Sequence, residues 1–323
     1  MRVLVAGGGG VVGQHLIPIL VGRGHAVVAL TRHAEKVGRL QGLGAEPAVA
    51  DALDRDAISS AVTRARPEAV IHELTALKGL RDFRNFDRTF GPTNRLRTEG
   101  TDNLLAAARA AGAARFVAQS YAGWPYAREG GLVKTEEDPL DPTPPRRARQ
   151  SLAAIRHLEA AVLQSPELEG LVLRYGSLYG PGTSVAPGGE QFEDLRRRRF
   201  PIVGSGAGVW SFVHVGDAAM ATALAVERGA PGLYNIVDDD PAPVAEWLPA
   251  LARAIGAPRP RRVPAWLGRL LGGEYVVTVM TEARGASNAK AKRDLGWTPS
   301  QPSWRGGFAA LVAAGATDQP AAP

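Results

Sequence analysis

Ser120 and Tyr121 are the hydroxyl side chains of this sequence that are best placed to transfer a proton, because they end the apolar run RFVAQSY. If that run is a parallel strand, both hydroxyls stand at the edge of the sheet where ligands bind. A tyrosine with no lysine beside it keeps a pKa of about 10, so only roughly a thousandth of it is ionised at pH 7. Such a group donates a proton readily and accepts one poorly, which favours reduction over oxidation. We therefore predict Tyr121 as the proton donor, with Tyr126 and Tyr175 in reserve beside the substrate. Packing in the core is the alternative for all three tyrosines.

The first residues carry a glycine motif that suits a nucleotide. The stretch VLVAGGGGVVGQHL places Gly7, Gly10 and Gly13 directly after an apolar run and at the start of an apolar helical pattern. In that context the glycines allow a tight turn and a close approach of a pyrophosphate to the backbone, and the helix N-terminus faces the anion. We predict nucleotide binding here, with Val11 and Val12 also in contact; a purely structural turn is the alternative.

The end of the second apolar run predicts which nucleotide binds. A carboxylate at this position would accept hydrogen bonds from the adenosine ribose of NAD, but the run VVALTR ends in Thr31 and Arg32. Arg32, together with Lys36, supplies positive charge suited to a ribose 2′-phosphate. The sequence therefore favours NADP(H) over NAD(H), unless Arg32 is an ordinary solvated arginine.

Short apolar runs alternate with helical patterns along the first half of the chain, as in RVLVAG before VVGQHLIPILVGRG and AVVALTR before HAEKVGRLQGLG. This alternation predicts an α/β fold with a Rossmann-like, doubly wound parallel sheet. We assign residues 1–180 to this NADP-binding domain, with a returning segment around 205–237. The less regular stretches 181–204 and 238–315 are predicted to form a smaller, interleaved C-terminal substrate domain, and 316–323 a disordered tail.

Composition excludes several other classes of protein. The chain has no cysteine and only six scattered histidines, so we expect no metal site. The net charge of +6 comes almost entirely from arginine, and the run RRRR has no interleaved aromatic residues, which argues against binding of nucleic acid. No apolar run approaches the roughly 18 residues of a membrane span, and the sequence starts without a signal-peptide pattern. We expect a cytoplasmic protein that does not bind membranes.

Several further motifs together resemble the extended short-chain dehydrogenases/reductases, the superfamily of nucleotide-sugar epimerases, dehydratases and related reductases. Beyond the glycine motif, the matching pieces are DALD, VIHELTA, GTDNLL, RFVAQS, LRYGSLYGPG, FVHVGD, GLYNIVDD and KRDLGW, which span nearly the whole chain. The resemblance implies a nicotinamide cofactor. Its expected contacts, besides the glycine motif, are Asp51, Ala52, Leu74, Thr75 and Ala76.

The catalytic pair of that family is missing from this chain. The resemblance implies a tyrosine and, four residues later, a lysine on a helix that continues to a glutamate. With Glu159 as that glutamate, the two positions hold Ser151 and Ile155, and no Tyr-x-x-x-Lys occurs anywhere in the sequence. Ser151 remains a catalytic candidate, as a side chain that positions a water in place of the tyrosine hydroxyl. The asparagine that the family has in an earlier helix is Arg97 here.

A further departure concerns the substrate. Where sugar-nucleotide enzymes of the family have an arginine that binds a diphosphate, this chain has Trp210 in GVWSFVHV. An indole cannot hold a diphosphate, so a bulky apolar or aromatic substrate is favoured. A place in the hydrophobic core is an equally good interpretation of Trp210.

These observations favour an NADPH-dependent reductase of a carbonyl or activated alkene on an apolar small molecule, with an atypical active site. Hydride can enter an activated alkene while the developing oxyanion needs only a hydrogen bond. Two alternatives stay open. One is a non-catalytic NADP-binding sensor or partner-binding protein, and the other, favoured only by the resemblance, is a nucleotide-sugar epimerase or dehydratase. A homodimer is the arrangement that the resemblance implies.

Overall fold

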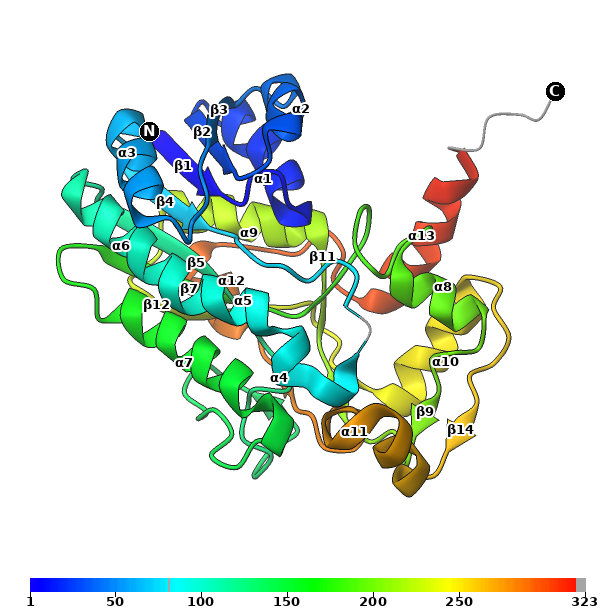
Figure 1. Ribbon diagram of the computed structural model, residues 1–323. Coiled ribbons are helices and arrows are strands. Elements are labelled where there is room, and N and C mark those ends of the chain that lie inside the picture. The colour runs from blue at the N-terminus through cyan, green and yellow to red at the C-terminus, as the bar shows by residue number, and fades with distance from the viewer. Residues whose placement is uncertain (81, 318–323) are drawn as a thin grey trace.

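A seven-stranded parallel sheet forms the centre of the larger part of the molecule (Figure 1). The computed structural model describes residues 1–80 and 82–317. The strand order is β12-β7-β5-β4-β1-β2-β3, and all neighbouring strands are parallel. The strands are β1 (Arg2–Ala6), β2 (Ala26–Thr31), β3 (Glu46–Val49), β4 (Ala69–His72), β5 (Arg115–Tyr121), β7 (Glu169–Tyr175) and β12 (Gly232–Ile236). The predicted α/β fold with a doubly wound parallel sheet is confirmed.

Helices cover both faces of this sheet because successive side chains of a buried strand point to opposite sides. On β1, Val3 and Val5 belong to one hydrophobic cluster, whereas Leu4 and Ala6 belong to another. The first cluster is completed by α1 (Val11–Gly22), α2 (Val37–Gly42) and α9 (Val215–Glu227). The second is completed by α3 (Arg55–Ala65), α6 (Thr101–Ala110) and α7 (Arg149–Leu163).

A nearly continuous helical segment leads into α6. It consists of η2 (Phe83–Asn85), α4 (Phe86–Thr89), α5 (Gly91–Arg95) and the π-helical turn η3 (Leu96–Gly100). The Thr101 hydroxyl donates a hydrogen bond of 2.9 Å to the carbonyl of Arg97 within this wide turn. A single π turn inside a helix frequently occurs at a functional site.

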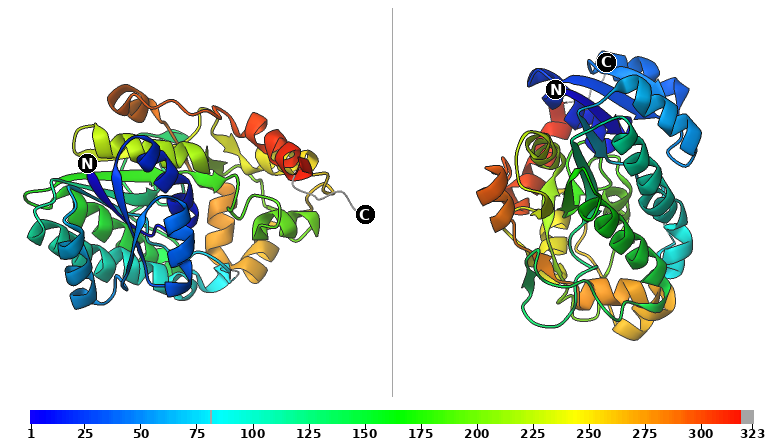
Figure 2. Two further views of the ribbon diagram at one scale, coloured as in Figure 1. Left: turned by 90° about the horizontal axis from the view of Figure 1, so that it is seen from above. Right: turned by 90° about the vertical axis from the view of Figure 1, so that its left-hand side faces the viewer.

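A second group of elements forms a smaller part with its own core. Trp247, Trp304, Phe212 and Phe308 are fully buried there. Figures 1 and 2 show α8, α10, α11 and α13 gathered at one end of the molecule, away from α3. The elements are β8 (Ser177–Tyr179), α8 (Glu190–Arg196), β9 (Ile202–Val203), β10 (Val209–Trp210), β11 (Phe212–His214), β13 (Ala242–Pro243), α10 (Val244–Ala254), β14 (Arg262–Val263), α11 (Ala265–Thr281) and α13 (Trp304–Thr317).

The structure corrects two of the predicted domain boundaries. Helix α12 (Ala289–Leu295), within the stretch 238–315 assigned to the small domain, packs against β12 and α9 of the larger part. Leu295 and Trp297 are fully buried in that core. Residues 316 and 317 of the expected tail belong to α13, and 318–323 lie outside the described residues.

The long polar loop after β5 is fastened to the body of the protein. Its strand β6 (Val133–Lys134) pairs in parallel with β15 (Gly285–Ala286), and Tyr126 forms a bridge with Leu140. Short 3₁₀ turns η1 (Ala34–Lys36) and η4 (Arg146–Ala148) precede α2 and α7. Within the described residues, no helix has both the length and the apolar character needed to cross a membrane.

Candidate active site

The glycine turn between β1 and α1 leaves space that side chains would fill. Gly7 has a positive φ of 99°, and a Cβ there would lie 2.7 Å from the carbonyl oxygen of Glu73. A Cβ at Gly13 would lie 2.6 Å from the carbonyl oxygen of Gly7. Helix α1 starts after Gly10 with no side-chain cap, so the amide groups of its first turn, which includes Val11 and Val12, are available to an anion. This cradle fits the pyrophosphate of a dinucleotide.

Positive charge lies beside the glycine turn. Thr31 ends β2, is buried, and accepts a hydrogen bond from the His33 amide at 3.2 Å. Arg32 is exposed, and Lys36 reaches over the turn to donate a hydrogen bond of 3.2 Å to the carbonyl of Gly9. The rim that would meet the adenosine ribose therefore holds two cations and no carboxylate among these residues.

The other predicted cofactor contacts line the sheet edge next to this turn. Asp51 uses a carboxylate oxygen to accept a hydrogen bond of 3.0 Å from the amide of Leu53, and Ala52 is buried. Leu74, Thr75 and Ala76, which follow β4 after the buried Glu73, are half-buried. Their roles in binding a cofactor stay predictions.

Helix α7 presents the predicted row of side chains, and the one hydroxyl in this row is hydrogen-bonded within the protein. Ser151, Ile155 and Glu159 are all buried on one face. The Ser151 hydroxyl donates to Asp87 at 2.8 Å and accepts from the Asn94 amide at 3.0 Å. Both partners lie on the α4–α5 segment, so this hydroxyl connects two helical elements.

Ser120 faces α7 and not the cavity at the end of β5. Its hydroxyl donates a hydrogen bond of 2.7 Å to Glu159 and is almost fully buried. Arg174 donates to both oxygens of the same carboxylate, at 2.7 and 2.6 Å. The Ser120 hydroxyl is therefore part of a buried charge network, and its catalytic role stays a prediction.

Tyr126 and Tyr175 are core residues, which corrects their predicted place beside the substrate. Each is about 1% exposed. The Tyr126 hydroxyl donates to Asn235, and the Tyr175 hydroxyl donates to Glu73 at 2.7 Å. Buried polar groups need such partners, and here the partners come from distant parts of the chain.

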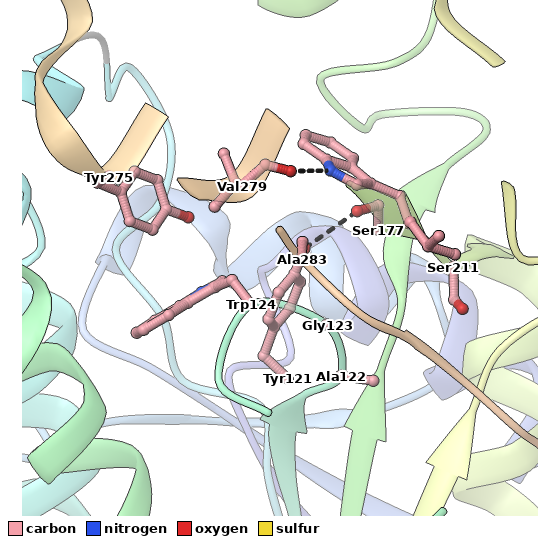
Figure 3. Close-up of a pocket in the computed structure, with 11 residues that line it drawn as sticks. Tyr121, Ala122, Gly123, Trp124, Ser177, Ser211, Tyr275, Val279 and Ala283 are labelled. Carbon is pink, nitrogen blue, oxygen red and sulfur yellow. Dashed lines mark hydrogen bonds between the residues drawn. The ribbon is translucent and has the colours of Figure 1, made fainter. Parts of the chain in front are cut away.

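Tyr121 does reach a cavity, between the end of β5, β10 and α11. Figure 3 shows its ring rising toward Ser177, with Tyr275 of α11 and Trp124 facing the same space. The hydroxyls of Tyr121 and Ser177 lie 3.0 Å apart. Trp210 forms another wall, and its indole nitrogen donates to the Val279 carbonyl at 2.8 Å.

The free volume of this cavity is only about 30 Å³, enough for about two water molecules. A substrate therefore needs the aromatic walls to move apart.

Burial sets the electrostatics of this cavity. It raises the pKa of Tyr121 above its ordinary value of 10, and the hydrogen bond with Ser177 and then the positive charge of Arg97 oppose that shift only in part. Burial raises the pKa of Tyr275 well above 10 for the same reason. Both tyrosines are consequently neutral at pH 7, more firmly than the sequence predicted for Tyr121.

Two residues that line this cavity, and a third whose charge acts on it, were not assigned a role from the sequence. Tyr275 and Trp124 belong to no recognisable motif. Arg97 is noticeable only as a replacement of the asparagine that the resemblance implies. It is 7% exposed and lies in the π turn, and burial lowers its pKa to about 10.

A parallel sheet with a glycine cradle at α1 defines a Rossmann-type α/β protein, and a smaller part with its own core adjoins the sheet. The chain belongs to the NAD dependent epimerase/dehydratase family, whose model matches residues 3–237. The predicted resemblance to extended short-chain dehydrogenases/reductases is confirmed.

Three known proteins illustrate this relationship. A 3-diazoavenalumate denitrifying reductase of a Streptomyces species is 49% identical over 95% of this chain and 99% of its own. A 2-alkyl-3-oxoalkanoate reductase of Stenotrophomonas maltophilia is 31% identical over 80% of this chain and 77% of its own. The structure of Thermus thermophilus UDP-glucose 4-epimerase with NAD has a TM-score of 0.72 and 28% identity, and the match covers 97% of this chain and 98% of that one. The names of the first two support the predicted oxidoreductase class.

Proposed function

We propose that this chain is an NADPH-dependent reductase that replaces the dinitrogen of an aromatic diazonium ion by hydride. The proposal combines the glycine cradle, the missing acid–base pair on α7 and the similarity to a denitrifying reductase of a diazo compound. It assigns the predicted reductase one particular reaction, and that reaction suits these residues.

The cofactor part rests on the cradle and its basic rim. The turn from Gly7 to Gly13 and the uncapped N-terminus of α1 would hold the pyrophosphate. Arg32 and Lys36 would bind a 2′-phosphate, because a guanidinium or ammonium forms charge-assisted hydrogen bonds with its oxygens. The missing carboxylate at Thr31 supports NADPH over NADH.

The observation that carries the proposal is the chemistry and surroundings of Ser151 and Ile155. Neither can exchange a proton with a ligand, since the Ser151 hydroxyl is bonded to Asp87 and Asn94 and Ile155 is a buried alkyl group. Bound NADPH would supply two electrons as hydride, so that a diazonium ion becomes the arene with release of dinitrogen and NADP⁺, without any proton taken up. A site without an acid–base pair is suited to this stoichiometry.

The aromatic walls of the cavity have a second use in such a reaction. Water also attacks aromatic diazonium ions and converts them to phenols. Trp124, Trp210 and Tyr275 leave little room for water, and exclusion of water prevents side reactions of a reactive intermediate. The same walls suit the flat body of an aromatic substrate.

Reduction of a carbonyl or an activated alkene is the second candidate, as the sequence predicted. It is favoured by the position of the Tyr121 hydroxyl in the cavity and by similarity to an oxoalkanoate reductase. In that reaction Tyr121 would donate the proton, and its raised pKa suits donation over acceptance.

Substitution of Tyr121 separates the two candidates. NADPH oxidation by wild type and Tyr121→Phe is measured with an aromatic diazonium salt and with a panel of ketones and enones, after subtraction of the rate without protein. Wild type should turn over the diazonium salt, and the variant should keep its rate within about threefold. Turnover restricted to ketones or enones, with a loss of about 100-fold or more in the variant, would favour the second candidate.

A further inference from the structure

Arg97 carries a buried positive charge that the protein does not pair. Its side chain is 7% exposed and lies in the π turn η3, which packs against α7. Among residues 1–80 and 82–317, no hydrogen bond or ion pair involves its guanidinium. The guanidinium nitrogens are also absent from the fully buried polar atoms that lack a partner. The guanidinium therefore faces accessible space.

The carboxylate that acts on the charge of Arg97 already has other partners. Glu159 influences the pKa of Arg97, but it receives two hydrogen bonds from Arg174 and one from Ser120. A buried charge without a partner is costly. A group from outside the protein is therefore expected to complete this site.

The charge of Arg97 acts on the aromatic cavity. It lowers the pKa of both Tyr121 and Tyr275, against the larger effect of burial. Both tyrosines line the cavity together with Trp124 and Trp210. With its own pKa at about 10, Arg97 remains charged at pH 7. Arg97 is not itself one of the residues that line the cavity, but its positive charge acts on two tyrosines that do.

We propose that Arg97 binds the carboxylate of an aromatic acid that enters this cavity as the substrate. The planar fork of a guanidinium matches the two oxygens of a carboxylate, and a single cation matches a single negative charge. The aromatic body would lie against Trp124 and Trp210. This inference rests on the proposed function and specifies its substrate class.

The same charge would orient a substrate that carries both a carboxylate and a diazonium group. Arg97 attracts the carboxylate and repels the diazonium ion, so both forces turn the reactive carbon away from η3. The predicted contacts of the cofactor phosphates lie on the first turn of α1 and after β2, so we do not expect the phosphates to bind Arg97.

Calorimetric titration tests this assignment without turnover. The protein saturated with NADP⁺ is titrated with 4-hydroxycinnamate and with the uncharged 4-hydroxycinnamamide. Wild type should bind the carboxylate at least tenfold more tightly than the amide. Arg97→Gln should weaken carboxylate binding roughly 10- to 100-fold, as expected for loss of a charged hydrogen bond, and leave amide binding unchanged. Arg97→Lys should restore part of the preference.

Arg95→Gln is the matched control, since Arg95 lies two residues earlier, is exposed and pairs with Glu99. It should behave like wild type. No preference of wild type for the carboxylate over the amide, including no binding of either, would overturn the proposal. So would an equal loss of both probes in Arg97→Gln, or a loss of NADP⁺ affinity, which would assign Arg97 to the cofactor. Failure of the diazonium assay alone would reject the proposed reaction and leave the carboxylate preference standing.

Discussion

The Ser151 hydroxyl donates a hydrogen bond of 2.8 Å to Asp87, and this bond ties α7 to α4 at the position where the family resemblance implies a catalytic tyrosine. Asp87 also accepts from the Ser151 amide at 2.8 Å. The helix that the resemblance implies to be catalytic has thus become a structural connection in this chain.

Ser151→Ala is expected to reduce stability more than catalysis. Loss of the bond leaves Asp87 with one partner fewer and should lower the free energy of unfolding by about 1–3 kcal/mol. Turnover of the diazonium salt should stay within about threefold of wild type. Chemical denaturation and steady-state kinetics measure the two effects. A large loss of kcat with unchanged stability would show that Ser151 takes part in the reaction.

Arg32→Ala is expected to weaken NADPH binding and to leave NADH binding almost unchanged. The substitution removes a charged partner of the 2′-phosphate, which is worth about 1.5–3 kcal/mol or roughly 10- to 100-fold in Kd. Fluorescence titration with both nucleotides measures the ratio. An equal loss for both nucleotides would contradict the assignment.

Gly13→Ala is expected to abolish cofactor binding. The new Cβ would lie 2.6 Å from the carbonyl oxygens of Gly7 and Gly8, both of which are backbone atoms of the turn. The turn must shift, and the pyrophosphate cradle shifts with it. Gly22→Ala, in the same helix, is the control, because its Cβ would meet nothing within 4 Å. It should bind NADPH like wild type, and Gly13→Ala with normal affinity would exclude this cradle.

Glu73→Gln is expected to remove a pH dependence of stability. Burial raises the pKa of Glu73 from 4.5 to about 8, and one of its carboxylate oxygens has no partner among the described residues. Between these pH values the folded state holds a proton that the unfolded state has lost. The free energy of unfolding of wild type should therefore fall as pH rises through this window, by about 1 kcal/mol per pH unit from this group.

Urea denaturation at pH 6 and pH 8.5 checks this expectation. Glu73→Gln should show the smaller decrease, because an amide cannot ionise. Glu99→Gln is a suitable control, since Glu99 is an exposed carboxylate whose pKa is lowered below 4.5 by Arg95. Identical pH profiles of wild type and Glu73→Gln would refute the raised pKa.

Local pattern was enough to predict the sheet and the nucleotide cradle. The strands are short apolar runs between helical patterns, and the glycine turn carries its own spacing, so both are encoded by neighbouring residues. The absence of a catalytic pair on α7 was equally visible, because Ser151 and Ile155 replace residues of defined spacing.

Contacts between segments that are far apart in the sequence explain why some predicted site residues lie elsewhere in the structure. Tyr126 and Tyr175 have the composition of site residues, but their partners Asn235 and Glu73 lie about a hundred positions away in the sequence. The Ser120 hydroxyl likewise bonds to a residue on another element, Glu159, which lies 39 positions away. Such partners are set by the topology of the sheet, which brings strand ends and helices together independently of sequence separation.

The most direct test of the proposed reaction follows a deuterium label from NADPH into the product. Wild type is incubated in ordinary water with an aromatic diazonium acid and NADPH deuterated at C4 on the transferred face. We predict that the arene carries deuterium at the carbon that lost dinitrogen, with one dinitrogen released per NADPH oxidised. An arene without deuterium at that carbon, or a phenol as the only product, would contradict hydride replacement.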